Sequence, residues 1–186
     1  MEIIDALEQS WALGANLIGK LDDAHLTRPT PCAGWDVRAL LNHTLGEAVM
    51  MSAVNRGEPS VHEWADVVDD DANLVQLWTA IGADNVASWR TSGLGGERTY
   101  FYGTFPARAS ALINLGEVVV HTGDLAEATG IDAPMDPDHA ALVYSLYSAF
   151  PLDGMRSSGQ LGPEVPVPEG APIGTRLLGL LGRDAR

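Results

Sequence analysis

The sequence predicts an all-α fold, a bundle of helices followed by an irregular C-terminal segment. Five segments place apolar residues at helical spacing, and each is longer than an ordinary strand. Proline and glycine residues punctuate the stretches between them, as expected for loops. The chain has 186 residues, 46% of them hydrophobic, which suits a single core, so we expect one domain over residues 1–186.

The first three helices are expected over residues 2–20, 36–55 and about 69–91. Asp36 is a suitable N-cap for the second, and the run of aspartates at 69–71 suits the negative first turn of the third. The connection that follows is rich in glycine and aromatic residues. A short hairpin between Gly93 and Gly103 is the most sheet that we expect.

The fourth helix is expected from about Pro106 to Gly130, because proline suits the first helical position and glycine the residue past the end. Its middle, ALINLGEVVVHTGDLAEA, is apolar nearly all round, which indicates a helix buried on several sides. A fifth helix is expected from Asp136 to about Phe150. An extended proline-rich stretch then leads to a short last helix near residues 174–182.

The composition argues against several classes of function. The formal net charge of -14 disfavours nucleic acid and anionic membranes as partners. The sequence shows neither a membrane-spanning apolar run nor a secretory signal, so we expect a cytoplasmic protein. Cys32 is the only cysteine, which excludes an intrachain disulfide and a zinc site built of thiolates. We interpret Cys32 as a small, half-buried side chain beside a turn.

The polar residues of the fourth helix are ordered. Asn114, Glu117, His121 and Asp124 are spaced three, four and three apart, which puts them in one row on one face. A buried carboxylate and imidazole need partners, and Glu117 and His121 are placed to chelate one cation. Asp124 is placed to orient the His121 ring from behind. Asn114 continues the row as a further supporting residue.

A third ligand is expected from another helix, and His43 is the candidate because it lies in the apolar run VRALLNHTLGEAV. Two histidines and a carboxylate are a catalytic zinc set that leaves one position open, and the same set suits ferrous iron or nickel. Glu47, one turn after His43, either supports a ligand or is solvated. His139 is expected to be exposed in the first turn of its helix. A metal-free core network remains the alternative.

These segments resemble a known family. TPCAGWDVRALLNHTLGE and GEVVVHTGDLAEATG resemble the two signatures of DinB-like proteins related to mycothiol-dependent maleylpyruvate isomerase. The ending LGPEVPVPEGAPIGTRLLGLLGRDAR is similar to that of a single-domain, metal-binding subgroup. The resemblance implies a DinB-type four-helix bundle with a divalent metal, commonly zinc, on His43, Glu117 and His121.

The resemblance also implies a function, in which the metal activates a low-molecular-weight thiol such as mycothiol for S-transfer or thiol-dependent isomerisation. The partners are then a small-molecule thiol and an electrophilic substrate. The two-domain isomerase has a further domain that supplies an active-site arginine, and this sequence lacks a counterpart, so maleylpyruvate is not the expected substrate. A non-catalytic metal-binding or small-molecule-binding bundle is the alternative. A homodimer is a reasonable assembly for such a bundle.

Overall fold

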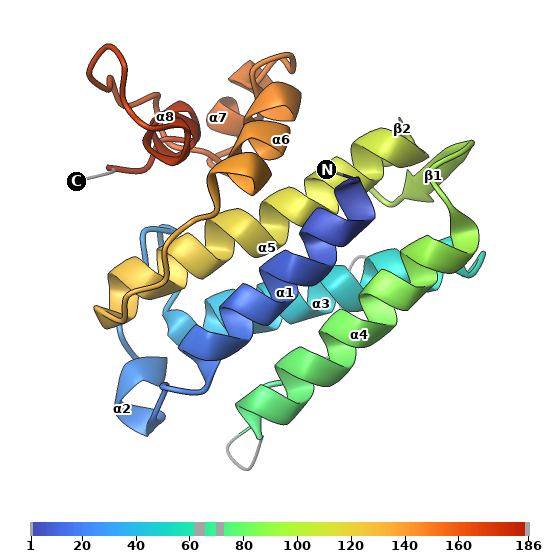
Figure 1. Cartoon of the computed structure of the whole chain (residues 1–186), viewed down its shortest axis with the longest axis horizontal. Helices are drawn as coiled ribbons and strands as arrows, with labels where there is room; N and C mark the ends of the chain where they lie inside the picture. The colour runs from blue at the N-terminus through green and yellow to red at the C-terminus, as the bar shows by residue number, and fades with distance from the viewer. Residues whose placement is uncertain (1, 62–65, 70–72, 185–186) are drawn as a thin grey trace. The chain divides into compact units, whose positions relative to one another are not determined.

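The computed structural model describes residues 2–61, 66–69 and 73–184, and the chain divides into two compact units, Met1–Pro134 and Met135–Arg186 (Figure 1). The described residues are mostly helical, and their sheet consists of two short strands. The predicted all-α class is therefore confirmed. The expectation that residues 1–186 form one domain stays a prediction.

The first unit is a bundle of four long helices (Figure 1): α1 (Ile3–Ile18), α3 (Val37–Asn55), α4 (Leu74–Ser92) and α5 (Ala107–Thr129). Helix α1 packs against α4 and α5, and α3 packs against the same two helices. Helices α1 and α3 therefore lie at diagonally opposite corners of the four-helix bundle. This order makes α3 and α5 direct neighbours, which brings their facing side chains together.

The ends of the long helices follow from local capping. The Asp36 side chain accepts a hydrogen bond from the amide of Ala39, and this cap starts α3 where the sequence predicts. Helix α5 ends at Gly130, whose left-handed backbone (φ 72°) suits glycine. Pro106, expected at the first helical position, is instead the N-cap residue.

Helix α4 starts later than the aspartate run predicts. Asn73 is its N-cap, and the Asn73 side chain accepts from the amide of Gln76 at 3.0 Å. This side-chain cap fixes the start at Leu74, so the acidic first turn expected from Asp69 is wrong. The other two aspartates of that run, at 70 and 71, lie outside the described residues.

Two short helices lie in stretches expected to be loops. Helix α2 (Asp23–Leu26) is held by a reciprocal capping box between Asp22 and His25, a local interaction that helical periodicity does not reveal. Helix α7 (Asp153–Ser157) is one residue longer. The predicted fifth and last helices are present as α6 (Pro137–Tyr147) and α8 (Ile173–Leu180).

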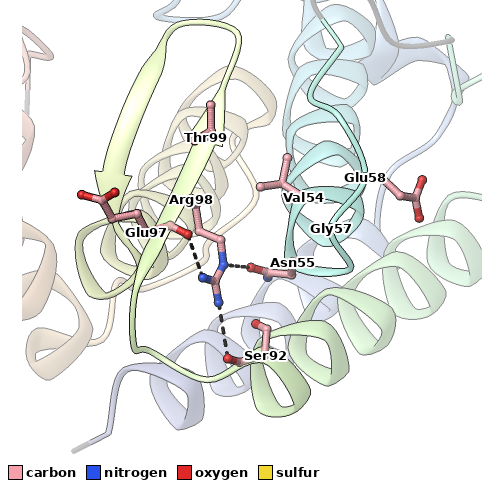
Figure 2. Close-up of a pocket in the computed structure, with 8 residues that line it drawn as sticks. All are labelled: Val54, Asn55, Gly57, Glu58, Ser92, Glu97, Arg98 and Thr99. Atoms are coloured by element: carbon pink, nitrogen blue, oxygen red, sulfur yellow. Dashed lines mark hydrogen bonds between the residues drawn. The ribbon is translucent and has the colours of Figure 1, made fainter.

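A β-hairpin connects α4 to α5. Its strands β1 (Glu97–Tyr100) and β2 (Gly103–Pro106) pair antiparallel, so the hairpin extends three residues beyond the predicted limit at Gly103. Figure 2 shows how Arg98 ties the hairpin to the helices: its Nε donates to Asn55 Oδ1 at 2.7 Å, and its Nη2 donates to the Ser92 carbonyl at 3.5 Å. The same Nη2 also donates to the Gly93 carbonyl at 3.0 Å. A cavity of about 470 Å³ adjoins these residues. Because the guanidinium already donates to the chain itself, it serves here as a structural link.

A buried polar node joins three helices of the bundle. The Asn85 side chain on α4 accepts from Trp11 Nε1 on α1 and donates to the Ala48 carbonyl and to Ser52 Oγ on α3, at 3.1 Å each. Asn85 is fully buried, so an unpaired amide there would cost free energy, and these bonds fix the register of α1, α3 and α4.

Two glycines let the same helices approach closely. A Cβ atom at Gly82 on α4 would lie 2.8–3.0 Å from the Trp11 indole, and one at Gly14 on α1 would overlap the ring of Trp78. The two indoles pack edge to face, with ring centroids 4.6 Å apart. Each glycine therefore faces a tryptophan of the other helix, and the pairing sets the distance between α1 and α4.

The second unit is organised by α6 and α8, which pack against each other. Arg176 of α8 lies over the Tyr144 ring of α6, 4.8 Å from its centroid, and donates to the Tyr144 hydroxyl at 3.1 Å. Before α8 the chain runs extended, and the amide of Val165 donates to the Gly179 carbonyl at 2.9 Å. The predicted extended segment and short last helix are both confirmed.

Among the described residues, the longest helices are too polar to form a membrane-spanning segment.

Replacement of Gly82 by alanine should destabilise the bundle. The new methyl group meets a rigid buried indole, and overpacking of this kind costs about 1–3 kcal/mol. Because the nearest Trp11 ring atoms lie at 2.8–3.0 Å, we expect the upper part of this range, which exceeds the roughly 1 kcal/mol that alanine gains over glycine in a helix. Urea unfolding should show a lower midpoint for Gly82→Ala. Gly95→Ala, where the added methyl group meets open space, should change the midpoint little, and equal midpoints for the two variants would contradict this packing.

Candidate metal centre

Helix α5 sets three ionisable side chains in one row, as the sequence predicts. Glu117 and His121 are one turn apart, and their Oε2 and Nε2 atoms are 3.1 Å apart. The other ring nitrogen of His121, Nδ1, lies 2.9 Å from Asp124 Oδ2. The His121 imidazole is therefore held between two carboxylates of its own helix.

His43 of α3 completes the cluster from the neighbouring helix. Its Nε2 atom lies 3.0 Å from Glu117 Oε2, the same oxygen that His121 approaches. The two imidazole rings are nearly perpendicular, with centroids 5.2 Å apart. One nitrogen from each histidine and a carboxylate oxygen of Glu117 thus lie within 4.8 Å of one another. The structure brings together all three residues that the sequence proposes as ligands.

The charges of Glu117 and the two histidines are complementary. Burial opposes ionisation of Glu117, but hydrogen bonds and positive charge from His121 and His43 outweigh it and hold the pKa of Glu117 well below its usual range. For His121, burial favours the neutral ring, yet its hydrogen bonds with Asp124, Cys32 and Glu117 raise its pKa well above 6.5. An anionic oxygen between two imidazoles is an arrangement suited to a cation.

Asp124 supports His121 from behind the cluster. The carboxylate is 1% exposed, and its Oδ2 atom accepts from His121 Nδ1 and from the Cys32 thiol, whose Sγ lies 3.5 Å away. When a cation takes the place of the Nε2 proton, the proton retained on Nδ1 leaves the Nε2 lone pair directed toward that cation. The sequence predicts a half-buried Cys32 beside a turn, but it does not reveal that Cys32 lies beside His121.

Glu47 lies one turn beyond His43 on α3 and is buried. Its Oε1 atom accepts a hydrogen bond from the Tyr102 hydroxyl at 3.0 Å. Burial, followed by the charge of Glu117, raises the pKa of Glu47 to about 8. Burial and the charge of Glu47 also raise the pKa of Tyr102. Of the two roles that the sequence left open for Glu47, the solvated one is therefore wrong.

Aromatic side chains from two connections lie near the cluster. Trp35, in the loop before α3, is 37% exposed, and its ring centroid is 4.7 Å from that of His43. Tyr102, at the tip of the hairpin, stacks on Tyr100 with centroids 5.2 Å apart and is itself partly exposed. Helical periodicity does not predict either neighbour, because both residues lie outside the helices.

Other polar candidates have different roles. Asn114, at the start of the row on α5, is fully buried and accepts from Trp89 Nε1 at 2.8 Å, so this hydrogen bond joins α5 to α4. His139 is 1% exposed, which contradicts the expected exposure in a first turn. The position of a residue in a helix does not show which other segment covers it. His139 belongs to the second compact unit.

The all-α bundle of the first unit has the DinB-like fold. The chain belongs to one family with this fold, described as the mycothiol maleylpyruvate isomerase N-terminal domain, whose model matches residues 7–126. His43, Glu117 and His121 all lie within the matched residues.

The chain is also similar to individual proteins and solved structures. Two uncharacterized proteins from two strains of Mycobacterium tuberculosis are each 30% identical over 196 aligned positions, which cover 100% of both chains. The crystal structure of the mycothiol-dependent maleylpyruvate isomerase matches with a TM-score of 0.56 and 19% identity, over 79% of this chain and 67% of that one. A mutant of that enzyme, with one histidine replaced by alanine, matches with a TM-score of 0.58 and 17% identity over the same shares. At these identities the two structures show a shared fold.

The raised pKa of Glu47 predicts a pH-dependent stability of the metal-free protein. Unfolded Glu47 loses its proton near its ordinary value of 4.5, whereas folded Glu47 keeps it to about 8. The native state therefore binds more protons between these values, and the free energy of unfolding falls as pH rises from about 5 to 8. Glu47→Gln should flatten this decline in urea unfolding series. The exposed control Glu58→Gln should keep it, and parallel curves for wild type and Glu47→Gln would refute the assignment.

Proposed function

We propose that this chain binds a divalent metal ion, zinc in the first place, through His43, Glu117 and His121. We further propose that it activates a low-molecular-weight thiol such as mycothiol toward an electrophile, by S-transfer or thiol-dependent isomerisation. The observation that supports this most directly is the convergence of two imidazole nitrogens on one ionised carboxylate oxygen, at 3.0 and 3.1 Å. Membership of the mycothiol maleylpyruvate isomerase N-terminal domain family supports the choice of thiol.

The spacing of the donors suits a tetrahedral ion. Two ligand atoms each about 2.1 Å from such an ion lie about 3.4 Å apart. The observed separations from Glu117 Oε2 are a few tenths of an ångström shorter, so small side-chain rotations of His43 and His121 admit the ion. The donor set of two imidazoles and a carboxylate also suits ferrous iron or nickel, and metal analysis distinguishes them.

A zinc ion on three protein ligands has an open position, and it favours the thiolate form of a bound thiol, which is the nucleophile. The remaining tasks belong to the chain. Asp124 holds the His121 ring with Nε2 toward the cluster, and Glu117 supplies the negative charge that attracts a cation. Trp35 offers an apolar surface beside His43 for a substrate. These features support a site that is open to small molecules on one side and supported by α5 on the other.

The Tyr102 hydroxyl and the Glu47 carboxyl form a second polar group beside the cluster. Addition of a thiolate to an electrophilic double bond forms the carbon–sulfur bond and leaves a carbanion or enolate that needs a proton. Glu47 retains a proton up to about pH 8 and is therefore a suitable source in the neutral range. We assign this pair the supply of that proton, directly or through Tyr102.

Removal of His43 should abolish metal binding. His43→Ala takes away one of three ligands, so the protein should lose most of its metal after dialysis against a weak chelator. The control is His25→Ala, which alters a histidine of the α2 capping box instead. Elemental analysis of both variants measures the outcome. Equal metal content in the two would remove His43 from the site.

The thiol itself is tested with cobalt in place of zinc. The Cys32→Ser variant should be used, because the added thiol is then the only thiol in the sample. Mycothiol, compared with bacillithiol and glutathione, should produce new sulfur-to-cobalt charge-transfer bands, and Glu117→Ala should abolish them along with the cobalt.

Thiol consumption by the zinc-loaded protein with a panel of electrophiles then separates the two functional classes. Turnover together with the bands supports the enzyme. Bands without turnover favour the non-catalytic metal-binding alternative. A spectrum that is indifferent to every thiol would contradict thiol activation while leaving metal binding intact.

A further inference from the structure

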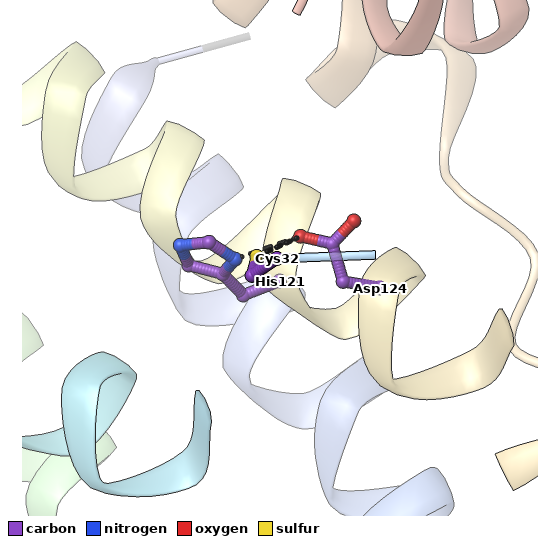
Figure 3. A group of neighbouring side chains, drawn as sticks. All are labelled: Cys32, His121 and Asp124. Atoms are coloured by element: carbon purple, nitrogen blue, oxygen red, sulfur yellow. Dashed lines mark hydrogen bonds and ion pairs between the residues drawn. The ribbon is translucent and has the colours of Figure 1, made fainter. Parts of the chain in front are cut away.

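The imidazole of His121 takes part in two separate clusters, one at each ring nitrogen. Nε2 lies 3.1 Å from Glu117 in the centre described above, whereas Nδ1 lies 2.9 Å from Asp124 Oδ2. The thiol of Cys32 approaches the same Asp124 oxygen at 3.5 Å (Figure 3). Figure 3 shows the sulfur and the carboxylate gathered on the Nδ1 side of the ring. Cys32, His121 and Asp124 each offer a ligand atom, and these atoms lie within 4.8 Å of one another.

The second cluster has the geometry of a metal site. A sulfur at about 2.3 Å and an oxygen at about 2.1 Å from a tetrahedral ion are about 3.6 Å apart, close to the observed 3.5 Å between Cys32 Sγ and Asp124 Oδ2. His121 and Asp124 are buried, while Cys32 is half-buried, so an ion entering past the thiol reaches donors already shielded from water.

The donor set differs in chemistry from that of the first cluster. His43, Glu117 and His121 offer nitrogen and oxygen, which suit zinc and other borderline ions. Cys32 adds a thiolate, a soft ligand that favours thiophilic ions. We propose that Cys32, His121 Nδ1 and Asp124 form a second metal site that takes thiophilic ions, such as Cd²⁺ or Cu⁺. As the ion binds, the Cys32 thiol proton and the proton on His121 Nδ1 are both released to solvent, and the ring keeps its proton on Nε2.

The shared histidine makes the two sites mutually exclusive. A neutral imidazole carries one proton, so only one of its nitrogens has a lone pair to donate. With an ion on Nε2, the Nδ1 proton is donated to Asp124, whereas with an ion on Nδ1 the Nε2 proton is directed to Glu117. A thiophilic ion at the second site therefore removes His121 from the first and releases the metal there. This inference rests on the proposed function only for that last step.

The test uses Cd²⁺ on the metal-free protein, with the sulfur-to-cadmium charge-transfer absorption in the ultraviolet as readout. Cys32 is the only cysteine, so any such band reports on it. Wild type and His43→Ala should each develop the band with one equivalent of Cd²⁺, because His43 belongs to the first site alone. Asp124→Asn and His121→Ala should require at least about tenfold more Cd²⁺ for the same band. Circular dichroism checks that each variant is folded.

A second measurement tests the exclusion. Protein loaded with one zinc ion should release that ion as the cadmium band forms, one zinc ion for each cadmium ion bound. A colorimetric zinc indicator follows the release. Two results would overturn the proposal: a band whose Cd²⁺ dependence is unaffected by both Asp124→Asn and His121→Ala, which indicates an isolated thiol, or zinc that stays bound while the band is complete. Failure to load zinc in wild type would instead count against the first site, since the cadmium band of His43→Ala is independent of it.

Discussion

The Glu117 carboxylate is bracketed by two imidazoles at the contact between α3 and α5, and the arrangement of the site depends on this contact. The Glu117 carboxylate is largely removed from water, and such a group without partners costs free energy, so the helices gain by keeping the register that faces His43 with Glu117. Helix α4 supports this register from the side, because its Asn85 bonds α3 through Ala48 and Ser52. Its Trp89 bonds α5 through Asn114. The core thus holds the helices at the spacing on which the candidate ligands rely.

The sequence allowed the row on α5 to be predicted because a helix fixes the relation between residues three and four apart. His43 could be inferred because it interrupts an apolar helical run. Cys32 and Tyr102 could not, since each reaches the site from a connection whose path depends on how it folds over the bundle. Cys32 is 92 positions from Asp124 in sequence, and no periodicity relates the two. The predicted exposure of His139 is wrong for a similar reason, because the burial of a short helix depends on tertiary contacts.

The family assignment and the candidate chemistry concern the first compact unit. The family model ends at residue 126, before the boundary at Pro134, and all three candidate ligands lie inside it. The similarity to the uncharacterized mycobacterial proteins extends over the whole chain, and so includes the second unit. The second unit has an organisation of its own, with Arg176 and Tyr144 linking α8 to α6. The candidate ligands therefore lie in the bundle, whereas the similarity to the mycobacterial proteins extends beyond it.

The close contacts between glycine and tryptophan on α1 and α4 also constrain how such a chain evolves. Gly82 faces Trp11, and Gly14 faces Trp78, so the volume missing at one position is filled by the other. A larger residue at either glycine becomes acceptable once the facing indole is replaced by something smaller. The two positions of each pair should therefore change together among homologous sequences, and such covariation would trace the α1–α4 contact in chains whose structures are unknown.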